Sequence, residues 1–511
     1  TRIPRWRADL AGIFENCGVR ILNTTVSQNV LFEKIRGKRM SKSYIGAVLR
    51  GVIGLAVAAA LTLPVRAETL ADALAAAYVN SGLIQQNRAL LRAADEDVVI
   101  AASKLRPILQ WSSSVKRSLS SGRIGSNGVY QSSDSTSTVA SAGLVAELLI
   151  YDFGASKLAV QVKKEAVLGT RQKLLSVEQK VLIRAVEAFT NVRRDTEKVA
   201  LRRSNLSLIT EELRAAKDRF DVGEVTRTDV ALAEARLAGS RSALAAAEGT
   251  LRVAVEEYRA AIGHAPKALN GSDKVLKPVK NLDAAKAIAV RQHPDIKELQ
   301  HSVTVAELTL QQAQLAKKPI VKLSGSYGLT ETLTSRAYGR SGEIKLQATG
   351  SIYQGGQIPA FVRQSAARRD AARYGLNLAV LAVEQNVATA YARLQVATAE
   401  KEASELQIRA ARVAFLGVRE EAALGARTTL DVLNAEQELL DAENNKVSAL
   451  ADQQIASYKL RSSMGRMTAD LLGLDVPKYD PEEYFSLQEN APAVSEQGKK
   501  LDRLLKSLGK K

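Results

Sequence analysis

Three charged residues in two similar stretches are the best candidates for chemistry in this sequence. Residues 222–230 and 424–432 share glycine, threonine, aspartate and valine at a constant offset of 202 residues, and they carry Asp229, Arg427 and Asp431. Carboxylate and guanidinium groups form charge-assisted hydrogen bonds with opposite charges. Arg427 and Asp431 stand one helical turn apart and could simply pair with each other. The set therefore favours electrostatic contacts over bond-making chemistry.

Other reactive residue types do not form a recognisable site. His264, His293 and His301 lack the spacing of metal ligands, and the single cysteine, Cys17, precludes a disulfide within the chain. No phosphate-binding loop, nucleotide fingerprint or nucleophile elbow occurs. A carboxylate-rich segment suits a solvated helix face better than an acid–base pair: Glu436, Glu438, Asp441 and Glu443. We predict that the protein is not an enzyme and that it binds no metal or cofactor.

Long helical hairpins are predicted to present the two similar stretches at their turns. The predicted hairpins cover residues 154–262 and 356–467. In the first, apolar and small residues recur at alternating spacings of four and three, from Val181 to Phe220 and again after the bend, which is the pattern of a coiled-coil seam. Each hairpin should therefore hold its turn far from its other end.

The turns carry residues that end one helix and start the next. Glycine suits a helix C-terminus, and threonine and aspartate suit a first turn: Gly223, Thr228 and Asp229 in one tip, and Gly425, Thr429 and Asp431 in the other. Four tip residues could be turn formers only, but their repetition at matched tips favours a docking surface for another protein: Gly223, Thr226, Gly425 and Thr428. Asp229 could likewise be an ordinary helix-start carboxylate.

A different period follows Pro107 and Pro319, where apolar and polar residues alternate. This alternation predicts four strands, each with one apolar and one polar face: 108–119, 136–150, 320–333 and 343–353. Residues 120–133 and 334–341 are predicted to be the connecting loops. A soluble sandwich is the alternative, but strands of this length and pattern are typical of outer-membrane proteins.

A secretion signal is predicted before the first repeat. Lys42 and Arg50 form a basic region before the apolar stretch of 13 residues at 51–63. A small-x-small cleavage site follows at residues 65–67. A transmembrane anchor is the alternative, but 13 residues are too few to span a bilayer. We interpret residues 40–67 as a signal peptide and residues 1–39 as an upstream extension from a mis-assigned start.

Composition and repetition complete the domain assignment. The net charge of +18 lies largely at the two ends of the chain and no nucleic-acid-binding motif accompanies it, so we predict no nucleic-acid partner. Aromatic residues make up only 5% of the chain, which favours extended helical packing.

We predict a first repeat at 68–282, a second at 283–468, and a polar, mobile C-terminal tail at 469–511.

Two copies of helix, strand pair and helical hairpin behind a signal peptide resemble the TolC family of outer-membrane efflux and type I secretion channels. The resemblance covers residues 68–474, and its most specific parts are the tips, 223–230 and 425–435, and the strand-to-helix junctions, 151–154 and 353–356. It implies an α+β membrane protein: a homotrimer with one transmembrane β-barrel, four strands per chain, continued by a long α-helical coiled-coil tunnel in the periplasm. Four strands cannot close a barrel alone, so the open strand edges also call for further chains.

The resemblance also implies a gate at the periplasmic end. Asp431 matches an acidic ring at the aperture, and Arg427 and Asp229 match residues that link neighbouring helices in the closed state. Asn434 stands where well-known members carry a second aspartate, and Ala422 stands where they carry a tyrosine latch. This chain thus keeps part of the latch and loses part of the acidic ring.

The expected function is a passive export duct in the outer membrane, in contact with its lipid. The resemblance implies that the tips dock a periplasmic adaptor protein and that an inner-membrane transporter supplies the energy. The cargo could be drugs, bile salts or secreted proteins. Two alternatives are a periplasmic coiled-coil adaptor or scaffold without a pore, and a surface adhesin.

Overall fold

The computed structural model describes residues 67–126, 129–270, 276, 279, 281–477, 479–484 and 503. The predicted upstream extension and almost all of the predicted signal peptide therefore lie outside the described residues. None of the described helices is long and apolar enough to cross a membrane.

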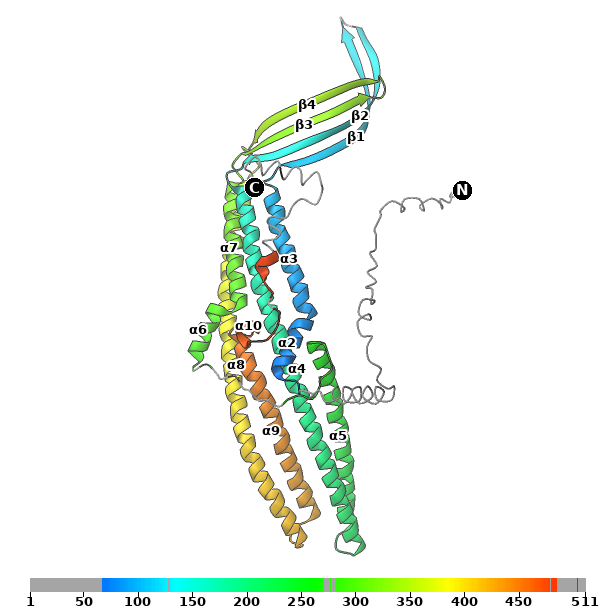
Figure 1. Ribbon diagram of the computed structural model, residues 1–511, viewed down its shortest axis with the longest axis vertical. Helices are drawn as coiled ribbons and strands as arrows, with labels where there is room; N and C mark the ends of the chain where they lie inside the picture. Colours follow the sequence, from blue (N-terminus) through cyan, green and yellow to red (C-terminus); the bar gives the residue numbers. More distant parts are fainter. Residues whose placement is uncertain are drawn as a thin grey trace, which may run out of the picture. The chain divides into compact units, whose positions relative to one another are not determined.

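Two repeats of one element order make up the described chain (Figure 1). The first repeat contains α2 (Leu70–Asn80), α3 (Gly82–Ser103), β1 (Ile108–Ser126), β2 (Val129–Tyr151), α4 (Ala155–Asp221) and α5 (Arg227–Ile262). The second contains α6 (Leu282–Gln292), α7 (Pro294–Leu315), β3 (Ile320–Thr332), β4 (Ala337–Thr349), α8 (Gln357–Ala423) and α9 (Thr429–Ser463). The short helix α10 (Ala469–Leu472) follows.

The strands form one antiparallel sheet in the order β1-β2-β3-β4 (Figure 1). Residues that face each other across strands lie on the same side of a sheet, and Trp111 pairs with Leu144, which pairs with Tyr327. The same register extends one apolar face over all four strands: Leu109, Trp111, Val115, Leu119, Ala140, Ala142, Leu144, Ala146, Leu148, Leu323, Tyr327, Leu329, Ile344 and Leu346. The other face is mainly polar. The predicted alternation of faces is confirmed.

Four predicted strand boundaries were wrong: the end of β1, the start of β2 and both ends of β4. β1 and β2 stay paired up to Ser126 and Val129, so most of residues 120–133 are strand and not a loop. In the second repeat only residues 333–336 form the turn, and β4 ends at Thr349, before the predicted end at 353. Serine and glycine dominate the first of these segments, so the side chains show no alternation although the backbone ladder continues.

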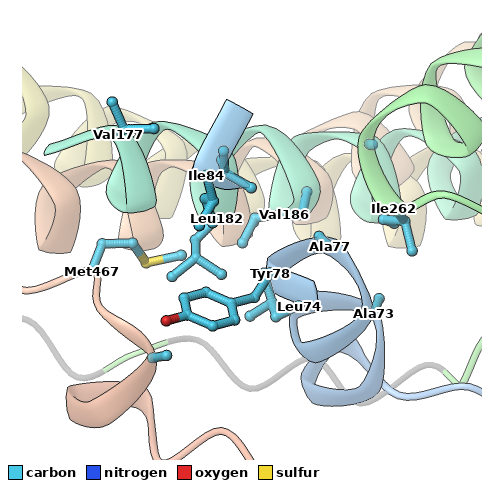
Figure 2. Packing of buried hydrophobic residues seen from close by; sticks show 14 of the residues in the cluster. Ala73, Leu74, Ala77, Tyr78, Ile84, Val177, Leu182, Val186, Ile262 and Met467 are labelled. Carbon is cyan, nitrogen blue, oxygen red and sulfur yellow. The ribbon is translucent and has the colours of Figure 1, made fainter. Parts of the chain in front are cut away.

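The largest core cluster packs α2, α3 and α5 against residues 167–192 of α4, and Figure 2 shows part of this packing. Its members include Leu182 and Phe189 of α4 and Ile84 of α3, each at most 1% exposed. Met467, after α9, is fully buried in the same cluster, and the Ala469 N–H donates to the buried Glu178 carboxylate at 2.6 Å. The prediction of a mobile tail that starts at residue 469 is therefore wrong at its beginning. The first residues after α9 belong to the core.

The two hairpins are α4–α5 and α8–α9, and in each the two helices pack along one another. In the first hairpin a buried seam near the tip joins the helices: Ile209, Leu213, Ala216, Ala233 and Leu237. These residues fall on the predicted spacing. α9 also packs against α4, which brings the two hairpins of one chain together.

Candidate functional site: the hairpin tips

Each tip is a helix end closed by a glycine in the left-handed region. Gly223 has φ 81° and its N–H donates to the Phe220 carbonyl at 3.0 Å, while the Glu224 N–H donates to the Arg219 carbonyl at 2.9 Å. Gly425 has φ 79°, and the second tip repeats both bonds at 3.1 and 2.9 Å. These paired bonds satisfy the last carbonyls of the helix, and only glycine adopts the required φ without strain.

A capping box then starts the returning helix in each tip. Thr226 Oγ1 accepts from the Asp229 N–H at 3.4 Å, and Asp229 Oδ2 accepts from the Thr226 N–H at 2.9 Å. Thr428 and Asp431 form the same pair of bonds at 3.3 and 3.0 Å. The turn-forming role considered for Gly223, Thr226, Gly425 and Thr428 is thus confirmed, and both threonines are N-caps.

The capping bonds keep both aspartates ionised. Hydrogen bonds from the Thr226 side chain and backbone lower the pKa of Asp229, and those from the Thr428 backbone and side chain lower the pKa of Asp431. A carboxylate that accepts hydrogen bonds is favoured in its charged form. Both tips therefore carry a fixed negative charge at neutral pH.

Arg427 does not pair with Asp431. Its Nε donates to Glu421 Oε2 at 2.9 Å, and this hydrogen bond is the main cause of the raised pKa of Arg427. Both side chains of the pair are about half exposed, so solvent screens the attraction. Within the described part of one chain, no hydrogen bond or ion pair joins Arg427 to Asp229.

Asn434 joins the two hairpins near their tips. Its Oδ1 accepts a hydrogen bond from Arg236 Nη2 at 2.8 Å, which joins α9 to α5. The family resemblance predicts Asn434 at the gate, whereas Arg236, 198 positions away in the chain, was not predicted.

A buried polar cluster lies beside this contact and corrects one prediction. Glu436 was assigned to a solvated face, but it is 5% exposed, whereas Glu438 and Asp441 are exposed. Asn205 of α4 donates to Glu436 Oε1 at 2.6 Å, and Ser240 of α5 donates to Asn205 Oδ1 at 2.6 Å. We call Asn205, Ser240 and Glu436 the three-helix cluster.

The sequence held a signal for this burial. Leu433, Glu436 and Leu440 are all buried, and their spacings of three and four are those of a coiled-coil seam. Burial raises the pKa of the Glu436 carboxyl to about 7, against the hydrogen bond from Asn205, which lowers it.

Comparisons with known proteins agree with this architecture. The family model "Outer membrane efflux protein" matches residues 73–264 and 287–466. The outer membrane efflux protein BepC of Brucella suis biovar 1 (strain 1330) is 34% identical over 420 residues, which cover 82% of this chain and 90% of BepC. The outer membrane protein TolC of Escherichia coli (strain K12) is 24% identical over 442 residues, or 83% and 87% of the two chains.

A solved structure shares the fold. The Campylobacter jejuni CmeC outer membrane channel superposes with a TM-score of 0.68 at 16% identity, covering 82% of this chain and 89% of CmeC. A sequence identity of 16% supports a shared fold and no more.

Proposed function

Since this chain belongs to the outer membrane efflux protein family, the TolC family, we propose that three copies form one passive export duct with a gate at its hairpin tips. Proteins of this family are efflux and secretion channels in the outer membrane, and they are not enzymes. The proposal concerns how many copies assemble, which residues close the duct and which partners engage it.

The observation that carries the trimer is the open sheet. Within the described chain β1 and β4 each pair with one strand only, so each leaves a row of unpaired backbone groups. Such groups cannot remain unpaired in lipid, and neighbouring copies can supply the missing partners. The continuous apolar face fits the lipid, and the polar face fits a water-filled interior.

The outer helices of the hairpins also fit neighbouring copies. α5 presents an exposed row of mainly small residues: Leu232, Ala235, Gly239, Ser242, Ala246 and Val253. α8 presents bulky apolar side chains that are at least half exposed: Val396, Leu406, Val413 and Leu416. Bulky side chains of one copy could fill the spaces beside the small residues of the next, as in a coiled coil.

Native mass spectrometry of the detergent-purified protein tests the assembly. We expect the mass of three chains, because three sets of four strands make a barrel wide enough for a channel. A monomer that is extracted without detergent would instead support the alternative of a periplasmic scaffold. A dimer or tetramer would refute the trimer while leaving the family assignment intact.

We assign the gate to Asp229, Arg427, Asp431 and Asn434. Arg427 is half exposed, and its partner within the chain is the equally exposed Glu421, so its guanidinium is free to exchange to Asp229 of a neighbouring copy. Three copies of the anionic Asp431 would bring like charges together at the aperture, which attracts cations. Asn434 adds no charge to this ring and holds Arg236 instead.

Removing the charge of Arg427 should raise the conductance of the channel, and removing the charge of Asp431 should change its ion selectivity. We expect Arg427→Gln to increase the single-channel conductance in planar bilayers several-fold, because it removes the closing contact between copies, and Asp431→Asn to reduce the preference for cations. Asn can still accept the capping bond, so Asp431→Asn separates charge from helix capping. Thr428→Ala is the matched control that removes the threonine side-chain cap and keeps the charge of Asp431. Conductance and selectivity that change only in the control would assign these residues to structure alone.

The exposed tips suit docking of a periplasmic adaptor, with an inner-membrane transporter as the source of energy. The docking residues we assign are Gly223, Thr226, Gly425 and Thr428, which give both tips the same backbone geometry. A deletion strain tested for antibiotic and bile-salt sensitivity and for its secreted proteins separates drug efflux from type I secretion. Tip variants that lose complementation but keep wild-type conductance would identify a docking defect.

A further inference from the structure

The three-helix cluster leaves one buried oxygen without a partner. Glu436 Oε1 accepts from Asn205, but Oε2 is buried and has no hydrogen-bond partner among the described residues. The Asn205 oxygen is already occupied by Ser240, so the chain of bonds ends at Glu436. A buried carboxyl group with an unpartnered oxygen is less unfavourable when protonated than when ionised, because burial penalises the charge most.

The charged surroundings do not compensate for ionisation. Glu212 on α4 opposes the charged form, and Arg236 on α5 favours it, although the Arg236 guanidinium also donates to Asn434. On α8, Arg412 pairs with Glu443 of α9 at 3.0 Å and is largely exposed. No full ion pair therefore reaches Glu436 in the described part of the chain.

We propose that Glu436 is a proton-sensitive clamp that holds α9 to the α4–α5 hairpin when protonated and loosens this contact when ionised. The clamp rests on the proposed function, because it requires that the tip helices move apart when the duct opens. The cluster is one of the contacts that such a movement must break, since its three members come from α4, α5 and α9.

The sign of the pH effect follows from burial. Burial raises the pKa of Glu436 to about 7 in the closed arrangement, and exposure in an open one would return it to about 4.3. The clamp is fully effective below the lower pKa and is lost as the pH rises through the higher one. Between pH 5.5 and pH 8 the closed-to-open ratio should therefore fall by about 30-fold.

Planar-bilayer recordings at about pH 5.5 and pH 8 test the clamp. The wild-type channel should be open more often at the higher pH, and Glu436→Gln should stay closed at both values because it is neutral and of the same shape. Glu436→Met provides a second uncharged side chain of similar length. The matched control is Glu234→Gln, the equivalent position in the first repeat, which is exposed and pairs with Lys217 at 2.9 Å.

A second readout separates failure of the clamp from failure of the channel. The melting temperature of the purified protein should fall between pH 5.5 and pH 8, and Glu436→Gln should lessen this fall whether or not the protein conducts. If neither the wild-type protein nor any of the variants conducts, the proposed duct and its gate are refuted. A wild-type pH response retained in Glu436→Gln, or lost equally in Glu234→Gln, would overturn the clamp.

Discussion

Replacing Leu346 by arginine is expected to prevent stable insertion of the sheet into the outer membrane, whereas the same replacement of Gln347 is not. The two residues are neighbours in β4, but their side chains point to opposite faces of the sheet. Leu346 lies opposite Leu323 on the apolar face and is 68% exposed within one chain, so lipid is its natural contact. Gln347 lies opposite Lys322 on the polar face.

The expected effect on membrane insertion is large, because every chain of the assembled barrel carries the substituted arginine. An arginine on the lipid face of a barrel costs about 2–4 kcal/mol near the middle of the membrane and less near its edges. Outer-membrane fractionation and the heat-modifiable mobility of the protein in gels measure insertion. Gln347→Arg controls for the added charge, since it should only change the interior. Normal insertion of Leu346→Arg would mean that this face does not contact lipid.

The faces of the strands were predictable, and their ends were not. A period of two assigns each side chain to a face wherever apolar and polar residues alternate, as around Leu323 and Tyr327, and the observed register agrees. In residues 120–133 serine occupies both faces, so nothing in the side chains reveals that the backbone pairing continues to Ser126. Strand length there depends on backbone hydrogen bonds, which the sequence does not encode residue by residue.

The tips were predictable because they are repeated, but their bonding partners were not. The glycines and capping aspartates stand at fixed local spacings, so turn chemistry can be derived from a few consecutive residues. The contacts between hairpins join residues far apart in the chain: Arg236 with Asn434, and Asn205 with Glu436, 231 positions apart. Such contacts depend on how α9 lies against α4 and α5. Seam spacing alone would have placed Glu436 inside, and its charge argued wrongly for the surface.

Replacing Phe189 by alanine is expected to destabilise the protein by about 3–5 kcal/mol, the usual range for a buried phenylalanine. Phe189 is fully buried in the cluster that joins α4 to α2, α3 and α5, where a cavity would loosen every one of these helices. The loss of stability has two causes. Apolar side-chain area is no longer buried, and the neighbouring side chains lose contacts because a densely packed interior relaxes only partly around a cavity.

The matched control is Phe361→Ala, which removes the same side chain from α8 at a position that is 44% exposed. The two variants should differ clearly in the urea midpoint of unfolding, followed by circular dichroism in detergent, with little change for Phe361→Ala. Because the cluster also holds Met467, loosening it should expose the segment after α9 to proteases before the hairpins unfold. Equal midpoints for both variants would mean that this cluster does not stabilise the helical domain.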